Sequence, residues 1–313
     1  MKILIIQPNH IGKRYWGHQL FRNEIGRQHD VIYYGEGFKN YNIELTLPQI
    51  INKFYGDSKP DVLMTYFGVN FLKGISNSYD KVNDIFKVHM IIDYMDGIMP
   101  ATNINLKKHK YDLVFAVTGS AVNNLRENKI CKRIEWLPFS VDINVYKNLY
   151  LEKTNDVLSS FSVREALYPN RGKIHDMLQE MKIENKFKKV IRNGLIEAIN
   201  SSKIMITSNN KWKSLSMRYT ETLACGGFLL ADKPQDLDKL GYVDGKHLVI
   251  YNDLDDLREK IIYYLDPENE KEREKIASCG MKHVRANHNC KVRVKEMIDV
   301  IERGMHENTI IKP

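Results

Sequence analysis

The stretch from Ser216 to Asp232 decides the fold and reads SMRYTETLACGGFLLAD. Ser216 precedes a run of helix-forming residues, and its hydroxyl can accept hydrogen bonds from the free backbone N–H groups of a first helical turn. Gly226 and Gly227 end that pattern and open a turn. The apolar run after them has the length and composition of a buried strand. The stretch therefore predicts a helix, a tight turn and a strand in close succession.

Two charged residues of this helix point to a ligand. Arg218 and Glu221 are three residues apart, so they share one helical face near the helix N-terminus. Free N–H groups and an arginine form a cradle for a phosphate, and a carboxylate one turn further on can accept hydrogen bonds from neighbouring sugar hydroxyls. A nucleotide sugar presents both a diphosphate and a ribose. The alternative is an Arg–Glu pair on the solvent face of an amphipathic helix.

The surroundings of this pair resemble a known signature. Residues 218–226 read RYTETLACG, and Asp232 follows the strand. This core resembles the nucleotide-sugar-binding signature of GT-B glycosyltransferases, in the branch typified by the spore maturation protein CgeB and related to glycosyltransferase family 4. The resemblance implies an α/β protein with two Rossmann-like, doubly wound parallel-sheet domains facing a central cleft, and a C-terminal helix that returns to the first domain. It also implies a hexosyltransferase whose donor is a nucleotide-diphosphate sugar, with a UDP-sugar favoured; we expect no cofactor and no metal.

Length and composition are those of a globular protein. The chain has 313 residues, 43% hydrophobic and 27% charged, which suits two domains of ordinary size. Its four cysteines are far apart and form no metal-binding or disulfide pattern. No run is apolar enough to cross a bilayer, and the first apolar run stops at Pro8, too early for a signal peptide, so we expect a cytoplasmic protein. The net charge of +8 is spread along the chain and permits nucleotides, nucleic acid or an anionic membrane as partners.

Strands and helices alternate along the first half of the chain. Strands are expected at 2–7, 31–34, 61–66, 86–93, 112–117 and 133–137, and helices at 15–27, 47–55 and 121–128. Such alternation predicts a parallel, doubly wound sheet, which binds ligands at the carboxyl ends of its strands. Residues 137–146 read LPFSVDINVY and resemble the stretch that closes the first domain of these enzymes. The polar segment after it places the boundary between an acceptor-side domain at 1–148 and a nucleotide-sugar-binding domain at 149–313.

The second half of the chain contains fewer predicted strands. Besides the strand of the signature stretch, strands are expected at 157–162 and 203–207. Helices are expected at 172–181, 187–200 and 254–265, with a last amphipathic helix over 294–305. Between 181 and 203 there is room for one helix, where the family often has a further strand–helix unit. The strand order of this domain is therefore left open.

Cationic groups must assist departure of the diphosphate. Arg218 is the first candidate, and Arg171 is the second, because it follows the first strand of the second domain in the sequence YPNR at 168–171. The CgeB-like branch has a similar Tyr-Pro-x-Arg at this place, and the DNA glucosyltransferase of T-even phages has comparable arginines. The alternative for Arg171 is a solvent-facing arginine in the first turn of a helix.

The acceptor hydroxyl must lose a proton, and Asp93 is the candidate base. It ends the hydrophobic strand that begins at Phe86, so we expect it at a strand end facing the cleft, where partial burial would set its pKa. This strand and the segment 67–74 distantly resemble the phage glucosyltransferase, in which the matching aspartate is the base. Asp93 can equally cap the next loop or helix. Asp96 is the second choice, because it lies in a turn beside a glycine.

Three further residues complete the predicted donor site. Gly12, in the loop NHIGKR at 9–14, allows a ligand to approach the backbone closely. Ser216 caps the signature helix. Lys213 stands where retaining members of family 4 have a glutamate, eight residues before the position of Glu221. A lysine there either neutralises phosphate or is solvated, and the missing glutamate favours inversion at the anomeric carbon.

The sequence leaves three functions open. The first is transfer of a sugar to a polysaccharide, lipid or protein of the cell envelope, which the dispersed charge favours. The second is transfer to hydroxymethylated bases of phage DNA, which requires a basic groove and a pocket for an extruded base. The third is a non-catalytic nucleotide-binding module.

Overall fold

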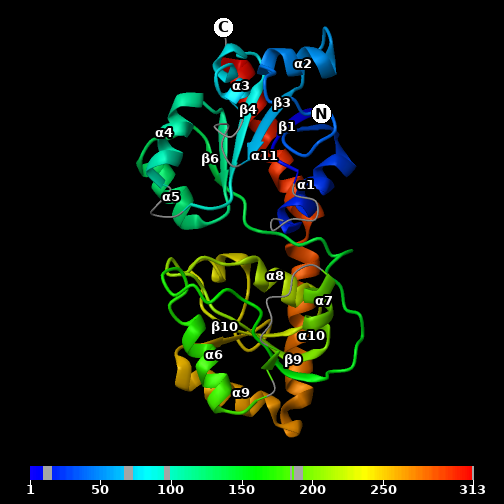
Figure 1. Cartoon of the computed structure of the whole chain (residues 1–313), viewed down its shortest axis with the longest axis vertical. Helices are drawn as coiled ribbons and strands as arrows, with labels where there is room; N and C mark the ends of the chain where they lie inside the picture. Colours follow the sequence, from blue (N-terminus) through cyan, green and yellow to red (C-terminus); the bar gives the residue numbers. More distant parts are fainter. Residues whose placement is uncertain (10–15, 67–72, 95–98, 184, 187–192, 312–313) are drawn as a thin grey trace. The chain divides into compact units, whose positions relative to one another are not determined.

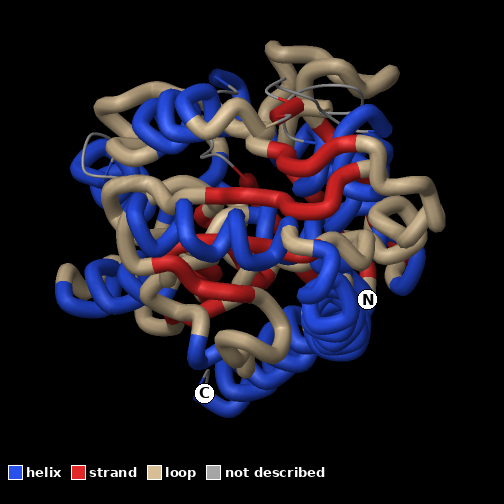
Figure 2. The backbone as a smooth tube through the Cα atoms, turned by 90° about the horizontal axis from the view of Figure 1, so that it is seen from below, coloured by secondary structure: helices blue, strands red, loops and turns tan. Residues whose placement is uncertain are grey.

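The chain folds into two compact units, each built around its own sheet (Figure 1). The computed structural model describes residues 1–9, 16–66, 73–94, 99–183, 185–186 and 193–311. The N-terminal unit comprises Met1–Pro138 together with Arg293–Pro313, and the C-terminal unit comprises Phe139–Val292. Figure 2 shows strands enclosed by helices and loops, the arrangement expected of α/β units.

The N-terminal unit has a six-stranded sheet in the order β2-β1-β3-β4-β5-β6, with all its strand pairs parallel. Its strands are β1 (Lys2–Ile6), β2 (Asp30–Tyr34), β3 (Val62–Tyr66), β4 (Phe86–Ile91), β5 (Leu113–Ala116) and β6 (Ile134–Trp136). Every residue of β3, β4 and β5 is buried, as expected for a parallel sheet covered on both faces. The helices are α1 (Trp16–Gln28), α2 (Leu47–Tyr55), α3 (Lys73–Ser76), α4 (Met99–His109), α5 (Gly119–Glu127) and the greater part of α11 (Cys290–Ile311).

The C-terminal unit has a five-stranded parallel sheet in the order β11-β10-β9-β7-β8. Its strands are β7 (Asn155–Leu158), β8 (Asn185–Lys186), β9 (Ser202–Thr207), β10 (Phe228–Asp232) and β11 (Val249–Tyr251). Its helices are α6 (Arg171–Glu180), α7 (Asn193–Asn200), α8 (Met217–Ala224), α9 (Leu254–Leu265) and α10 (Glu270–Asn287). The predicted succession of helix, turn and strand in the signature stretch is confirmed as α8, the turn at Gly226 and β10.

The strand order of the C-terminal sheet identifies where a ligand is expected. The strand β8 lies on one side of β7, whereas β9, β10 and β11 follow on the other. The order therefore reverses between β7 and β9. Doubly wound sheets bind ligands outside the carboxyl ends of their strands at such a point. The loops that follow β7 and β9 are the ones placed for binding.

The elements α3, α4, β8 and β11 are not among those that the sequence predicts. The region between 181 and 203 contains a short strand as well as a helix, because Asn185 and Lys186 pair with β7. Helix α4 is not evident from the sequence, because it buries just Leu106 and His109 and therefore lacks a continuous apolar face.

The segment 139–148 packs within the C-terminal unit, although the sequence places it in the first domain. Val141 forms a parallel bridge with Asn289. The hydroxyl of Tyr146 donates a hydrogen bond to Glu221 Oε1 at 2.8 Å. These contacts join residues far apart in the chain, so the polar composition after residue 147 does not mark where the compact unit begins.

Helix α11 begins in the C-terminal unit and continues in the N-terminal unit. The guanidinium of Arg133 donates hydrogen bonds to Glu307 and Asn308, and the Asn308 amide donates to Asp112. Gly304 lies so close to the ring of Phe86 that an added Cβ would be 2.8 Å from Cζ. The expected return of the last helix to the first unit is confirmed.

A glycine in α10 tests the packing of the C-terminal unit. A Cβ at Gly280 would lie 2.2 Å from the carbonyl oxygen of His247, whereas a Cβ at Gly172 in α6 would meet nothing within 4 Å. Gly280→Ala is therefore expected to lower the free energy of unfolding by about 1–3 kcal/mol despite the better helix propensity of alanine. The matched Gly172→Ala variant should be neutral or more stable by up to about 1 kcal/mol. Urea denaturation measures both, and a Gly280→Ala variant as stable as wild type would contradict the packing.

Candidate functional site

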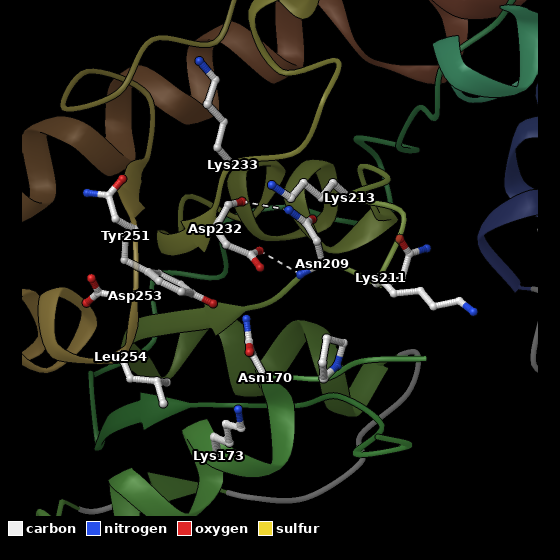
Figure 3. Close-up of a pocket in the computed structure, with 13 residues that line it drawn as sticks. Asn170, Lys173, Asn209, Lys211, Lys213, Asp232, Lys233, Tyr251, Asp253 and Leu254 are labelled. Carbon is white, nitrogen blue, oxygen red and sulfur yellow. Dashed lines mark hydrogen bonds between the residues drawn. The ribbon is translucent and has the colours of Figure 1, made fainter. Parts of the chain in front are cut away.

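A pocket of about 460 Å³ lies at the carboxyl edge of the C-terminal sheet (Figure 3). It is formed by the residues that follow β9, β10 and β11 and by the first turn of α6. Its lining includes four lysines, Lys173, Lys211, Lys213 and Lys233, and two aspartates, Asp232 and Asp253. Fully ionised, these side chains carry a net positive charge, which favours an anionic ligand.

The start of α6 adds to the positive potential of the pocket. The first turn of this helix has no acidic residue, and its N-cap residue Asn170 makes no side-chain capping bond. Both Asn170 and Lys173 line the pocket. Because the first N–H groups of a helix lack intrahelical partners, they and the Lys173 ammonium together suit a phosphate.

Lys213 lines the pocket, and the donor-binding role that the sequence predicts for it stays a prediction. Its backbone is left-handed, with φ of 51°. The turn around it is held by Asn210, whose side-chain oxygen accepts from the N–H groups of Trp212 and Ser214 at 3.1 Å. The Lys213 side chain is exposed. The lysine is thus available to an anion in the pocket.

Arg171 is buried rather than solvent-facing, which removes the alternative raised by the sequence. Its Nε and Nη2 atoms donate to the carbonyl oxygen of Ser208 at 2.9 and 2.7 Å, and Nη1 donates to that of Ser162 at 3.3 Å. The guanidinium lies over the ring of Tyr168, 3.5 Å from its centroid. Burial lowers the pKa of Arg171, and the nearby Arg218 lowers it further. Arg171 therefore joins the loops after β7 and β9, and its role in donor binding stays a prediction.

Arg218 and Glu221 form a largely buried ion pair. The Nη1 atom of Arg218 donates to Glu221 Oε2, and its Nε donates to the carbonyl oxygen of Ser160 at 3.3 Å. Glu221 Oε1 accepts from Tyr146, so both carboxylate oxygens have a partner. Burial and the adjacent Glu221 carboxylate raise the pKa of Tyr146 well above its usual value. The side chain of Glu221 is 7% exposed, so a pair on the solvent face of the helix is ruled out.

Ser216 occupies the N-cap position of α8, as predicted, but its side chain makes no capping bond. Tyr219 N–H bonds to the Ser216 backbone carbonyl instead, at 3.2 Å. The hydroxyl is buried, with no hydrogen-bond partner in the part of the chain that the structure describes. The expected cap hydrogen bond is therefore absent at Ser216. Ser216 does not line the pocket, and its role in donor binding stays a prediction.

The predicted residues of the N-terminal unit are only partly described. Asp93 follows β4, two residues after the strand ends at Ile91, and its side chain is exposed. Gly12 and Asp96 lie outside the described residues, as does most of the segment 67–74. Among the residues that are described, none that lines the pocket comes from this unit.

Several pocket residues were not predicted from the sequence. Asn209 donates its side-chain N–H to the carbonyl oxygen of Asp232 at 3.1 Å and its backbone N–H to the Asp232 carboxylate at 2.7 Å. Tyr251 donates from its hydroxyl to the carbonyl oxygen of Thr207 at 3.1 Å. Each stands directly at or after the end of a strand. That position, together with the paired asparagines at 209–210, is the signal that could have identified them.

Comparisons with known proteins agree with this architecture. Residues 179–299, which include α8 and β10, match the sequence pattern of the family described as glycosyl transferase-like. No curated protein matches the chain significantly.

Within the described residues, no helix has the length and apolar character needed to span a membrane, and no group of three or more His, Cys, Asp or Glu side chains is placed to hold a metal ion.

Solved structures with the GT-B glycosyltransferase fold superpose on nearly the whole chain. HepE from Anabaena, crystallised with UDP, has a TM-score of 0.68 at 12% identity, covering 97% of this chain and 100% of its own. A glycosyltransferase from Rickettsia africae ESF-5 has a TM-score of 0.64 at 13% identity, covering 97% and 98%. Sucrose-phosphate synthase from Thermosynechococcus elongatus has a TM-score of 0.64 at 11% identity, with the same coverage. The chain therefore has the GT-B fold, as the signature stretch predicts.

Proposed function

We propose that this protein transfers a hexose from a nucleoside-diphosphate sugar, with a UDP-sugar favoured, to a hydroxyl of a saccharide, lipid or protein acceptor. The observation that carries the proposal is the lysine-lined pocket at the carboxyl edge of β9, β10 and β11. It lies largely within the region that matches a glycosyl transferase-like family. HepE from Anabaena, which shares the fold, has been crystallised with UDP-glucose.

The charges of the pocket suggest how the donor is held. The diphosphate is placed between Lys213 and the first turn of α6, where Lys173 supplies a second cation. Arg218 does not line this pocket, and we propose that it reaches the diphosphate from the start of α8, beside the loop that follows β7. Glu221 holds Arg218 in place through their ion pair, and both of its oxygens are bound to protein groups, so the ribose contact that the sequence predicts for it is not part of this proposal.

The reaction needs a leaving group and a base. The bond between the anomeric carbon and the diphosphate oxygen breaks, and the cationic groups stabilise the charge that develops on the diphosphate. A new bond forms between the anomeric carbon and the acceptor oxygen, whose proton passes to the carboxylate of Asp93. With Asp93 as base and no glutamate at position 213, we propose inversion at the anomeric carbon.

A panel of UDP-, GDP- and dTDP-sugars tests this proposal together with the role of Asp93. A bound donor raises the melting temperature by mass action, and a turned-over donor releases free nucleoside diphosphate. The Asp93→Asn variant is expected to keep the thermal shift and to lose at least about 100-fold in turnover. The matched Asp84→Asn variant alters an exposed aspartate of the same unit and should behave as wild type. Stabilisation by none of the sugars would refute the proposed function, and wild-type turnover in Asp93→Asn would refute the base alone.

A further inference from the structure

We propose that Asp232 binds two neighbouring O–H or N–H groups of the donor's nucleoside and so selects which nucleotides the pocket accepts. The inference rests on the proposed function, since it concerns the same pocket. Asp232 ends β10 and lies among the lining residues, with the pocket lysines around it (Figure 3). Asp232 is the last residue of the signature stretch, and the proposed transfer reaction assigns it no role.

The Asp232 carboxylate is held in a fixed orientation. Oδ1 accepts the backbone N–H of Asn209 at 2.7 Å, and Oδ2 accepts the hydroxyl of Ser208 at 3.0 Å. A carboxylate oxygen can accept two hydrogen bonds, so each oxygen keeps capacity for one more. Two neighbouring donors on a ligand would fill that capacity in a bidentate arrangement.

The pocket lysines do not neutralise this carboxylate. No ion pair involving Asp232 forms among the residues that the structure describes. Its pKa is raised by burial, whereas the Asn209 and Ser208 donors and the charge of Arg171 act in the opposite direction. A half-buried carboxylate without an ion-pair partner gains from further hydrogen-bond donors, because it has lost part of its hydration.

The other nearby carboxylates are less suited to this task. Asp253 is exposed, and its side chain caps α9 by accepting the N–H of Asp256 at 2.9 Å. Glu221 does not line the pocket, and its two oxygens are bound to Tyr146 and Arg218. Asp232 is thus the carboxylate that combines a fixed orientation, partial burial and a place in the pocket wall.

The negative charge of the Asp232 carboxylate determines which part of the donor it can contact. A carboxylate repels a phosphate, so with the diphosphate at Lys213 and the first turn of α6 the nucleoside is the part of the donor that contacts Asp232. Two nucleoside groups present adjacent donors: the 2′- and 3′-hydroxyls of a ribose, and the N1–H with the 2-amino group of guanine. The uracil N3–H lies between two carbonyl oxygens, which a carboxylate would repel. The ligand group is therefore a ribose diol or a guanine edge.

Calorimetric titration of four nucleotides separates these two sources. UDP against 2′-deoxy-UDP tests the diol, and GDP against IDP, which lacks the 2-amino group, tests the guanine edge. In wild type, one of the two pairs should differ by roughly tenfold in Kd, and Asp232→Asn should abolish that difference. The asparagine amide can still accept from Asn209 and donate to the Ser208 hydroxyl, so the fold should be kept. Ser208→Ala, which frees one carboxylate oxygen, should give an intermediate difference.

The controls distinguish this inference from the proposed function. Asp253→Asn, which alters the exposed carboxylate of the same pocket and keeps an N-cap side chain for α9, should retain the wild-type preference. Equal Kd values within both nucleotide pairs in wild type would overturn the role of Asp232. That role would also be overturned if the preference survived in Asp232→Asn, or if Asp253→Asn alone removed it. Failure of all four nucleotides to bind would instead refute the proposed function, and this inference with it.

Discussion

Arg218→Met is expected to destabilise the C-terminal unit by about 3 kcal/mol and to abolish donor binding. The Arg218 guanidinium contacts one oxygen of Glu221, whose side chain is 7% exposed, and it joins α8 to the Ser160 carbonyl. Its removal leaves a buried carboxylate with Tyr146 as its remaining partner. An unpaired buried charge is costly, because little solvent is available to stabilise it. Chemical denaturation and calorimetric titration of UDP measure the two effects.

A double variant separates stability from binding. In Arg218→Met/Glu221→Gln the buried negative charge is gone, so a large part of the lost stability should return. Donor binding should stay lost, because the cation beside the loop after β7 is still missing. Wild-type affinity for UDP in either variant would contradict the role of Arg218 and leave the ion pair as a purely structural contact.

The second large effect is expected from the pocket lysines. Lys173→Met and Lys213→Met should each weaken UDP binding about tenfold, and the double variant about 100-fold, since each removes a charge-assisted contact to the diphosphate. Methionine keeps most of the length of the side chain, so the packing should change little. The affinity of wild type should fall as salt is added, and that dependence should be weaker in the double variant.

A lysine outside the pocket provides the control for this series. Lys275 is an exposed residue of α10 in the same unit, and it does not line the pocket. Lys275→Met changes the net charge by the same amount as either pocket variant. It should leave the Kd for UDP within about twofold of wild type, because an exposed charge that does not contact the ligand is screened by salt. An equal loss of affinity in Lys275→Met would mean that net charge, and not this pocket, governs binding.

The alternation of apolar runs and helical patterns was sufficient to predict the architecture. Buried parallel strands read as continuous apolar segments, and β1, β3 and β5 are of this kind. The signature stretch identified α8 and β10 because its capping position, glycines and apolar run are all local features. Helix α4 and strand β8 have weak local patterns. The first buries few residues, and the second is two residues long, so tertiary contacts define both.

The candidate site was predictable only in part, because its contacts join distant segments. The sequence predicted Lys213, which lines the pocket, as a donor-site residue, and it predicted Arg218 and Glu221 to share one face of a helix. It could not reveal that Glu221 binds Tyr146, which lies 75 residues away in the chain. Nor could it reveal that Arg171 spans the loops after β7 and β9, or that Asp232 is oriented by Asn209. These relations arise when neighbouring strands of one sheet bring their carboxyl ends together.

The most direct test of donor binding in the lysine-lined pocket is a crystal structure of this protein grown with a saturating concentration of UDP. We predict that the diphosphate lies in the pocket at the carboxyl edge of β9, β10 and β11, within hydrogen-bond distance of Lys213 and the first turn of α6. Its nucleoside should lie on the side of Asp232. Electron density for UDP at any other place, or an empty pocket at saturation, would contradict donor binding in this pocket.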